Sequence, residues 1–291
     1  MRIRKQFLTR AWLLCLLTCA LSNLWGCDTI LPKAPDSSWF TRVEALDGAE
    51  GIEHYTIAHA RRSGKNLIFV AIDDGIQQMF TTELKAAVRD QTPSVRLEEL
   101  AWRRFLPRFR GIYDEVIRIR YDATTRDALF RAIAFMEARR IPYDLLLLTH
   151  GMRNHLVLSK GWGLLRWRDV RKLEGKLGFL DLVYLQICEG ARPDPTGPSF
   201  ATDWHAAGAR HVLAFPDLNR NFFFVDIFYD YYRGNNIADA YRKTSENMEF
   251  HLTRTWTYFL VMKNLDSRIR EISGMPAGDY FLSAPPILSE R

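Results

Sequence analysis

Four short apolar runs constrain the fold of this chain more than any other feature. Each run is rich in Leu, Val, Ile or Phe, is bounded by polar or turn residues, and is continuously hydrophobic rather than alternating. Such a pattern indicates a strand buried on both faces, as in a parallel sheet that helices cover on each side. The runs are Asn66–Ile72, Asp144–Thr149, Asp181–Ile187 and Arg210–Phe215.

Segments with helical spacing alternate with these runs, so we expect an α/β three-layer sandwich with a mainly parallel central sheet. A chain of 291 residues is long enough for one large domain. Two further segments invite a prediction: Asp114–Tyr121 is expected to be a half-exposed strand near a sheet edge, and Trp102–Arg110 a surface loop whose aromatic residues pack. The predicted helices are Ile76–Asp90, Thr124–Arg140, Trp167–Leu177, Ser199–Ala207, Asn221–Tyr232 and Ile237–Leu260.

Residues with catalytic chemistry follow two of the apolar runs. His150 and Gly151 come directly after one run, and Cys188 comes after the next. Because parallel strands present their carboxyl ends at one edge of the sheet, His150 and Cys188 are expected on neighbouring loops. An imidazole can take the proton of a thiol and so activate it as a nucleophile. The backbone N–H groups of Gly151 and Cys188 are candidate donors to an oxyanion.

The same residues resemble the caspase-like cysteine peptidases, the group that includes caspases, legumains, gingipains, clostripain and separases. LLLLTHG and DLVYLQICEG fit a strand ending in His-Gly and a later strand ending in Cys, and QICEG is similar to the caspase Q-A-C-x-G signature. The stretches FATDWHAAGARHVLAF and FFFVDIFYDYYRGNNIADAYRKT resemble the segments that follow the nucleophile in CHAT-type peptidases. The resemblance spans about Asn66 to Thr244. It implies a caspase-like fold, a protein or peptide substrate, and cleavage after one charged or polar residue without a cofactor, although some relatives use calcium.

The resemblance also suggests residues that bind substrate. In separases and CHAT-type enzymes, an acid near the place of Asp217 helps to hold a basic residue before the scissile bond. The alternative is that Asp217 begins a turn or caps the next helix. Glu189, in the variable position of QICEG, is a second candidate. Other charged residues on these loops leave the preference open, since acids would favour a basic residue and arginines an acidic one: Asp194, Asp203, Arg153, Arg192 and Arg220.

The N-terminus has the features of an export signal. Basic residues precede the apolar run Ala11–Leu21, which is too short for a comfortable membrane span. Leu24-Trp25-Gly26-Cys27 resembles a bacterial lipobox, although Trp25 departs from the usual small residue. We therefore expect a signal peptide over residues 1–26, lipidation of Cys27, a tether over 27–38 and the domain over 39–291. The alternatives are a plain N-terminal anchor or a cleaved signal without lipid.

The basic balance of the chain belongs largely to this signal. The whole chain has a formal net charge of +6, but residues 1–26 hold four basic residues and no acid, so the 36 basic and 34 acidic residues that remain give +2. This value and an exported location argue against nucleic acid as a partner. The histidine pairs His54/His59 and His150/His155 lack the i,i+4 spacing of a helical zinc site.

The sequence thus predicts a membrane-anchored cysteine endopeptidase of the bacterial cell envelope, with His150 and Cys188 as its dyad. The alternative is a non-catalytic envelope lipoprotein that uses a caspase-like domain to bind other proteins.

Overall fold

A computed structural model describes residues 39–43, 51–58, 63–72, 97–158, 163–187, 189–193, 197–216, 223–254 and 287–290. The described residues belong to one compact unit, Ser37–Arg291. Met1–Asp36, with the predicted signal peptide and Cys27, lies outside the described residues. None of the helices in the described part of the chain is both long and apolar enough to cross a membrane.

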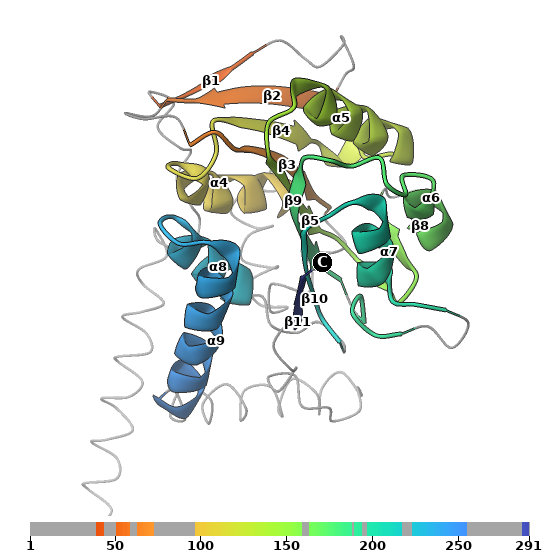
Figure 1. The fold of residues 1–291 in the computed structure, drawn as a ribbon. Coiled ribbons are helices and arrows are strands. Elements are labelled where there is room, and N and C mark those ends of the chain that lie inside the picture. The colour runs from red at the N-terminus through yellow and green to blue at the C-terminus, as the bar shows by residue number, and fades with distance from the viewer. Residues whose placement is uncertain are drawn as a thin grey trace, which may run out of the picture. The chain divides into compact units, whose positions relative to one another are not determined.

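Helices and strands alternate along most of the chain, as the apolar runs predict (Figure 1). The helices are α4 (Leu97–Phe109), α5 (Arg126–Arg139), α6 (Trp167–Arg171), α7 (Phe200–Ala207), α8 (Phe223–Tyr232) and α9 (Ile237–Arg254), with a 3₁₀ turn, η5, at Tyr121–Ala123. The strands are β1 (Phe40–Arg42), β2 (Ile52–Ile57), β3 (Asn66–Ala71), β4 (Glu115–Ile119), β5 (Tyr143–Leu148), β6 (Gly151–Met152), β7 (His155–Val157), β8 (Leu164–Arg166), β9 (Leu180–Gln186), β10 (His211–Ala214) and β11 (Ile287–Glu290).

The described strands form a central sheet of eight strands and a small sheet of three. The central sheet has the order β1-β2-β4-β3-β5-β9-β10-β11. Five consecutive strands, from β4 to β10 in this order, run parallel to one another, whereas β1, β2 and β11 are joined by antiparallel pairings. The prediction of a mainly parallel α/β sheet is confirmed. β6, β7 and β8 form the small antiparallel sheet, which directly follows β5 in the chain.

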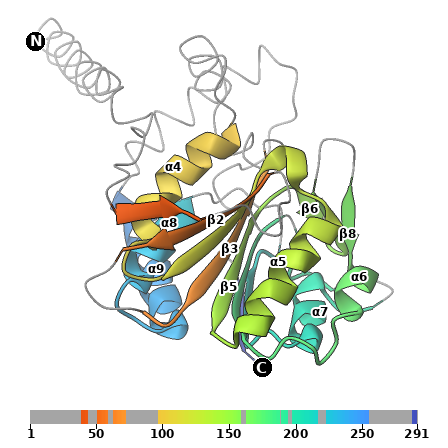
Figure 2. The ribbon, with the colours of Figure 1, turned by 90° about the horizontal axis from the view of Figure 1, so that it is seen from above.

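Helices cover both faces of the central sheet (Figure 2). Along β5, Leu145 and Leu147 join the apolar cluster that contains residues of α5, α6 and α7, whereas Leu146 and Leu148 join the cluster that contains residues of α4, α8 and α9. Alternate side chains of a strand point to opposite faces, so both sets must be apolar when both faces are buried. This arrangement explains the continuous hydrophobicity of the runs.

Two helices begin and end within two residues of the predicted positions. The side chain of Thr125 caps α5 by accepting a hydrogen bond from the N–H of Ala128, and Ser199 caps α7 in the same way. Gly208 ends α7 with φ +131°, and a Cβ at this position would lie 2.0 Å from the carbonyl oxygen of Leu177. Only glycine fits such a close backbone approach.

The prediction of a surface loop over Trp102–Arg110 is wrong, because this segment is helical as far as Phe109, the last residue of α4. Trp102, Phe105 and Phe109 are buried under the sheet, so their expected packing is present, but on one face of a helix. Pro107 lies in the last turn of the helix. Its arginines form ion pairs, as Arg104 does with Asp226 of α8.

The edge position predicted for Asp114–Tyr121 is also wrong. β4 lies inside the sheet, between β2 and β3. Arg118, the charged residue that suggested exposure, is buried. Its Nη2 lies 2.7 Å from Oε2 of Glu99 in α4, and its Nη1 lies 3.5 Å from Oε2 of Glu53 in β2. These ion pairs offset the cost of burying the guanidinium of Arg118 inside the sheet.

Two predicted helices need further comment. The helix predicted over Trp167–Leu177 is shorter than expected, because α6 ends at Arg171 and turns follow it. The helix predicted over Ile76–Asp90 lies outside the described residues.

Candidate active site

The two strands that precede the candidate dyad are direct neighbours in the sheet. β5 and β9 pair in parallel, and their register places Leu148 opposite Gln186, the last residue of each strand. His150 follows Leu148 by two positions, and Cys188 follows Gln186 by two positions. Cys188 itself lies outside the described residues. The carboxyl ends of these two strands therefore lie side by side, which is where parallel α/β sheets form their sites.

The loop after β5 holds His150 through its backbone. The carbonyl oxygen of His150 accepts hydrogen bonds from the N–H of Val157 at 2.7 Å and from Oγ1 of Thr149 at 2.9 Å. Leu148 in turn accepts a hydrogen bond from the N–H of Ile72 at 3.0 Å. The His150 side chain is half-buried. The strand end and the small sheet thus fix the backbone from which the imidazole projects.

Gly151 begins the small sheet and lies against its neighbouring strand. A Cβ at Gly151 would lie 2.7 Å from the carbonyl oxygen of His155 and 3.0 Å from Cα of Leu156, so β7 occupies the space of a side chain. The N–H of Val157 donates to His150, so these two residues form a hydrogen-bonded pair of the antiparallel ladder. The next pair, Gly151 and Leu156, is then a non-hydrogen-bonded pair, in which each N–H points away from the other strand. The N–H of Gly151 is therefore directed away from β7, as a donor to a ligand requires.

A second histidine, His155, accompanies His150 on this edge. His155 begins β7, and its Nδ1 lies 2.8 Å from Oδ1 of Asn154. Burial lowers the pKa of His155, and the positive charges of Arg166 and His150 lower it further. The two imidazoles are thus close enough to interact electrostatically. The five-residue spacing alone did not indicate this, because the small sheet brings them together.

Glu189 joins the loop after β9 to the turn between β6 and β7. Its carboxylate accepts hydrogen bonds from Nε and Nη2 of Arg153, at 2.8 and 3.3 Å, and from Nη1 of Arg192 at 2.8 Å. The hydrogen bond from Arg153 is the largest cause that lowers the pKa of Glu189, and the charges of both arginines add to it. Glu189 has φ +53°, a conformation that side chains rarely adopt.

Backbone hydrogen bonds tie the start of α7 to the same two loops. The N–H of Phe200 donates to the carbonyl oxygen of Arg153 at 3.2 Å, and the N–H of Ala201 donates to that of Gly190 at 3.0 Å. The loop after β5 and the loop after β9 are therefore held by a charged contact and by a shared helix end.

The remaining predicted site residues are only partly described. Asp203 is buried in α7, where its carboxylate accepts a hydrogen bond from Arg171 at 2.8 Å. Burial raises the pKa of Asp203, whereas Arg171 lowers it. The structure thus gives Asp203 an arginine of α6 as its partner. Outside the described residues lie Asp217, Cys27, Asp194 and Arg220.

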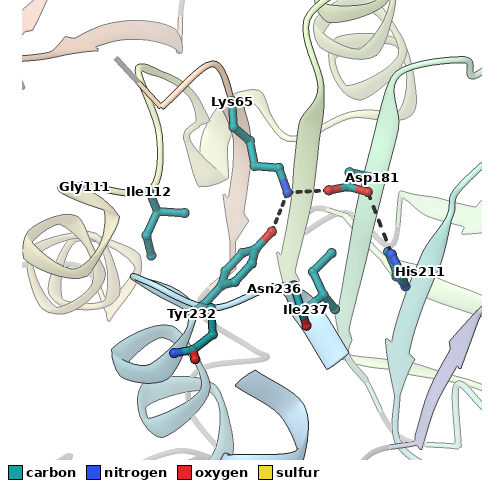
Figure 3. A pocket seen from close by; sticks show the side chains of 9 residues that line it. Lys65, Gly111, Ile112, Asp181, His211, Tyr232, Asn236 and Ile237 are labelled. Atoms are coloured by element: carbon teal, nitrogen blue, oxygen red, sulfur yellow. Dashed lines mark hydrogen bonds and ion pairs between the residues drawn. The ribbon is translucent and has the colours of Figure 1, made fainter. Parts of the chain in front are cut away.

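A second group of ionisable residues lies at the opposite edge of the sheet, where the parallel strands begin (Figure 3). Lys65 precedes β3, Asp181 is the second residue of β9, and His211 begins β10. Nζ of Lys65 donates to Oδ2 of Asp181 at 2.5 Å and also contacts the hydroxyl of Tyr232. Burial alone would lower the pKa of Lys65, but Asp144 and Asp181 raise it above its ordinary value.

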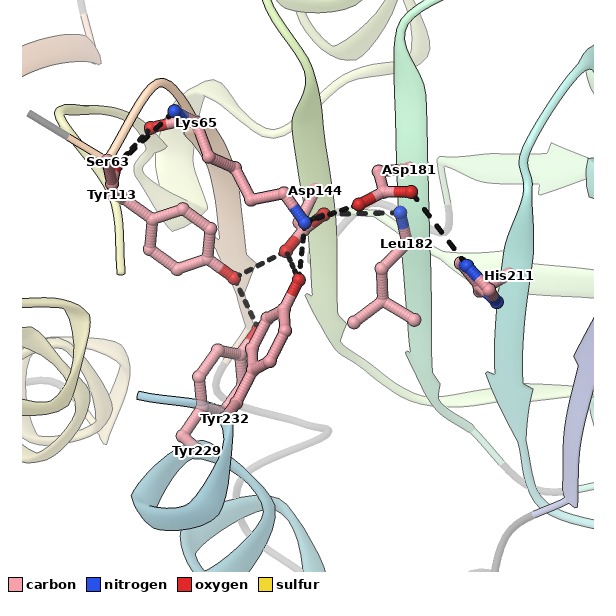
Figure 4. Close-up of polar contacts among 9 residues, drawn as sticks. All are labelled: Ser63, Lys65, Tyr113, Asp144, Asp181, Leu182, His211, Tyr229 and Tyr232. Atoms are coloured by element: carbon pink, nitrogen blue, oxygen red, sulfur yellow. Dashed lines mark hydrogen bonds and ion pairs between the residues drawn. The ribbon is translucent and has the colours of Figure 1, made fainter. Parts of the chain in front are cut away.

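Asp144 is the fully buried centre of this group (Figure 4). Its Oδ2 accepts hydrogen bonds from the hydroxyls of Tyr113 at 2.8 Å and Tyr232 at 3.0 Å. Its Oδ1 accepts one from the N–H of Leu182 at 3.2 Å and lies 3.2 Å from Nζ of Lys65. Burial raises the pKa of Asp144, and these donors oppose that effect by stabilising the charged form.

One weak signal for this group is present in the sequence. Asp144 and Asp181 both stand at the start of an apolar run, where a charge is costly unless it is paired. Nothing local identified Lys65 or Tyr232 as their partners, because these residues are far apart in the chain.

Within the described ranges, no three His, Cys, Asp or Glu side chains gather in a way that could hold a metal ion. Nε2 of His54, a member of one of the two histidine pairs, lies 3.0 Å from Oε2 of Glu115. Comparison of the chain with protein-family models and with curated proteins finds no match.

Proposed function

We propose that the chain is a cysteine endopeptidase with a caspase-like fold, in which His150 and Cys188 form the catalytic dyad. The observation that carries this proposal is the parallel pairing of β5 and β9, with Leu148 opposite Gln186. Both candidate residues come two positions after these paired strand ends. Neighbouring loops at one sheet edge are the arrangement that a nucleophile and its base require.

In the proposed mechanism, Sγ of Cys188 attacks the carbonyl carbon of the peptide bond after transferring its proton to His150. The imidazolium then protonates the leaving amine as the C–N bond breaks and a thioester forms. His150 next takes a proton from water, which hydrolyses the thioester and restores the thiol. The N–H of Gly151, which is directed away from β7, is a candidate donor to the oxyanion of each step.

The charges around this edge are compatible with a thiolate. Arg153 and Arg192 carry two positive charges against the single carboxylate of Glu189. A net positive surrounding lowers the pKa of a nearby thiol and increases its nucleophilicity at neutral pH. Lipidation of Cys27 is part of the same proposal and would hold the domain at a membrane surface of the cell envelope, where its substrates would be proteins or peptides.

The experiment is hydrolysis of a fluorogenic peptide library by the purified chain, compared with Cys188→Ala and His150→Asn. Each change is expected to reduce kcat/KM by at least about a hundredfold, because it removes the nucleophile or the group that moves its proton. Mass spectrometry of peptides after brief iodoacetamide treatment measures the reactivity of Cys188 directly.

His155→Asn is the matched control, because it removes the neighbouring imidazole on the same small sheet. It should keep most of the activity, whereas His150→Asn should not. Hydrolysis that is equal in the unchanged chain and in Cys188→Ala would contradict the proposal. A complete lack of hydrolysis, with an unreactive Cys188, would instead favour the non-catalytic binding protein.

A further inference from the structure

A cavity of about 300 Å³ lies at the amino-terminal edge of the parallel strands, the opposite edge from His150 (Figure 3). Its volume is at the lower end of the range for small-molecule sites. The lining combines charged and apolar side chains. The residues that matter for its chemistry are Lys65, Asp181, His211, Ile112, Ile237 and Tyr232.

Lys65 cannot serve an anionic ligand in this cavity. An ammonium group has three N–H donors. In the structure Nζ of Lys65 contacts Oδ2 of Asp181, Oδ1 of Asp144 and the hydroxyl of Tyr232. An anion that recruited Lys65 would therefore have to leave a buried carboxylate without its partner, which is strongly unfavourable.

Asp181 offers the opposite chemistry. Its Oδ2 is taken by Lys65, and its Oδ1 lies 3.9 Å from Nε2 of His211, beyond the length of a hydrogen bond. Oδ1 receives no hydrogen bond from any described residue. The two carboxylates of Asp144 and Asp181 stand against the one ammonium of Lys65. A cation that donates to Oδ1 would complete both the hydrogen bonding and the charge.

The neighbouring asparagines are already engaged. Asn235 accepts a hydrogen bond from Lys243 at 2.6 Å and donates one to the carbonyl oxygen of Tyr231 at 2.6 Å. Asn236 caps α9 by accepting a hydrogen bond from the N–H of Asp239 at 2.8 Å. Asp181 is thus the acceptor that the lining presents to a ligand.

The single open oxygen also selects the kind of cation. A guanidinium binds a carboxylate best through both oxygens at once, whereas an ammonium is a compact charge that one oxygen can hold. Ile112, Ile237 and the ring of Tyr232 provide an apolar wall for an attached carbon chain. We propose that this cavity binds a small free primary alkylamine in its ammonium form, through Oδ1 of Asp181. This inference does not depend on the peptidase proposal.

Ile112 and Ile237, which line the cavity, serve as NMR probes of binding. The full chain, labelled with ¹³C at isoleucine methyl groups, is titrated with n-butylammonium and followed by NMR. The methyl signals of Ile112 and Ile237 should shift with a Kd on the order of millimolar. The signal of Ile133, buried against the other face of the sheet, should not move. Along the series from methylammonium to butylammonium, the affinity should rise by up to about fourfold per methylene.

Asp181→Asn should weaken butylammonium binding by about tenfold or more, because it removes the charged acceptor. Glu246→Gln, which removes an exposed carboxylate on α9, is the matched control and should change nothing. If Asp181→Asn does not fold, the series from methylammonium to butylammonium on the unchanged protein still tests whether the cavity binds an alkylamine.

Several results would overturn the proposal. They are shifts with inorganic phosphate but not with butylammonium, equal affinity for butylguanidinium, a flat chain-length series, and unchanged binding by Asp181→Asn. Binding of Nα-acetyl-lysine N-methylamide as tightly as butylammonium would also overturn the assignment to a free amine, in favour of a lysine side chain of another protein.

Discussion

The two edges of the parallel sheet use charged residues in opposite ways. At the amino-terminal edge, Asp144 is fully buried and is surrounded by hydroxyl, amide and ammonium donors. At the carboxyl-terminal edge, Glu189 is partly exposed on a loop and is held by two arginines. Burial raises the pKa of Asp144, whereas the hydrogen bond from Arg153 lowers that of Glu189. The central carboxylate of the first edge is wholly buried, whereas the paired carboxylate of the second edge keeps contact with solvent.

The reason for this difference is topological. The parallel strands of the central sheet lie between two layers of helices. A charged residue inside such a strand is therefore desolvated and needs a partner within the fold. The loops that leave the carboxyl ends lie outside the layers, where side chains keep contact with water. Three predictions test this contrast, in order of decreasing effect on stability.

Removal of the buried acid should have the largest effect. Asp144→Ala is expected to lower the free energy of unfolding by about 3–5 kcal/mol, because Lys65 and two tyrosine hydroxyls lose a buried partner. Asp144→Asn, which keeps the shape and one acceptor, should cost less. Urea unfolding measures both. Glu246→Gln, an exposed acid, should leave the stability nearly unchanged. Equal stability of the chain and Asp144→Ala would show that this network does not stabilise the fold.

Filling the space at Gly151 should have an intermediate effect. Gly151→Ala places a Cβ 2.7 Å from the carbonyl oxygen of His155, so the small sheet must shift. A cost of about 1–3 kcal/mol is typical of such overpacking. Gly197→Ala is the matched control, because no described residue other than its chain neighbours lies within 4 Å of its Cβ position. If the N–H of Gly151 also serves the oxyanion, peptide hydrolysis should fall further than the loss of folded protein explains. A Gly151→Ala chain as stable as the control would contradict the close approach of β7.

The smallest effect is expected from the acid at the carboxyl-terminal edge. Glu189→Gln should cost about 1 kcal/mol at neutral pH, since it weakens the hydrogen bonds from Arg153 and Arg192. Because the folded-state pKa of Glu189 is lowered, its contribution is full above the unfolded-state pKa and is lost as the pH falls through the lower folded-state value.

The measurement is the unfolding free energy of the unchanged chain and of Glu189→Gln between about pH 6 and pH 3. The difference should be constant above about pH 5 and should shrink below about pH 4. A difference that grows on acidification would mean that Arg153 does not stabilise the charged form. Arg153→Gln should reduce the same difference, because the two residues act as one pair.

Much of the fold could be predicted from the sequence. The continuous apolar runs located β3, β5, β9 and β10, and the predicted ranges of α5 and α7 end within two residues of the observed ones. Both signals are local in the sequence, so no distant partner is needed to read them. The loops on which His150 and Gly151 lie could also be predicted, since a parallel sheet presents strand ends at one edge.

Only the tertiary structure decided which segments meet. The sequence did not predict that β4 lies inside the sheet, that Arg118 pairs with Glu53 and Glu99, or that Trp102–Phe109 is helical, because each depends on partners distant in the chain. The contact of Lys65 with Asp144, Asp181 and Tyr232 has the same origin. A local pattern reports whether a residue prefers burial, but the order of the strands determines which charge can neutralise another inside the core.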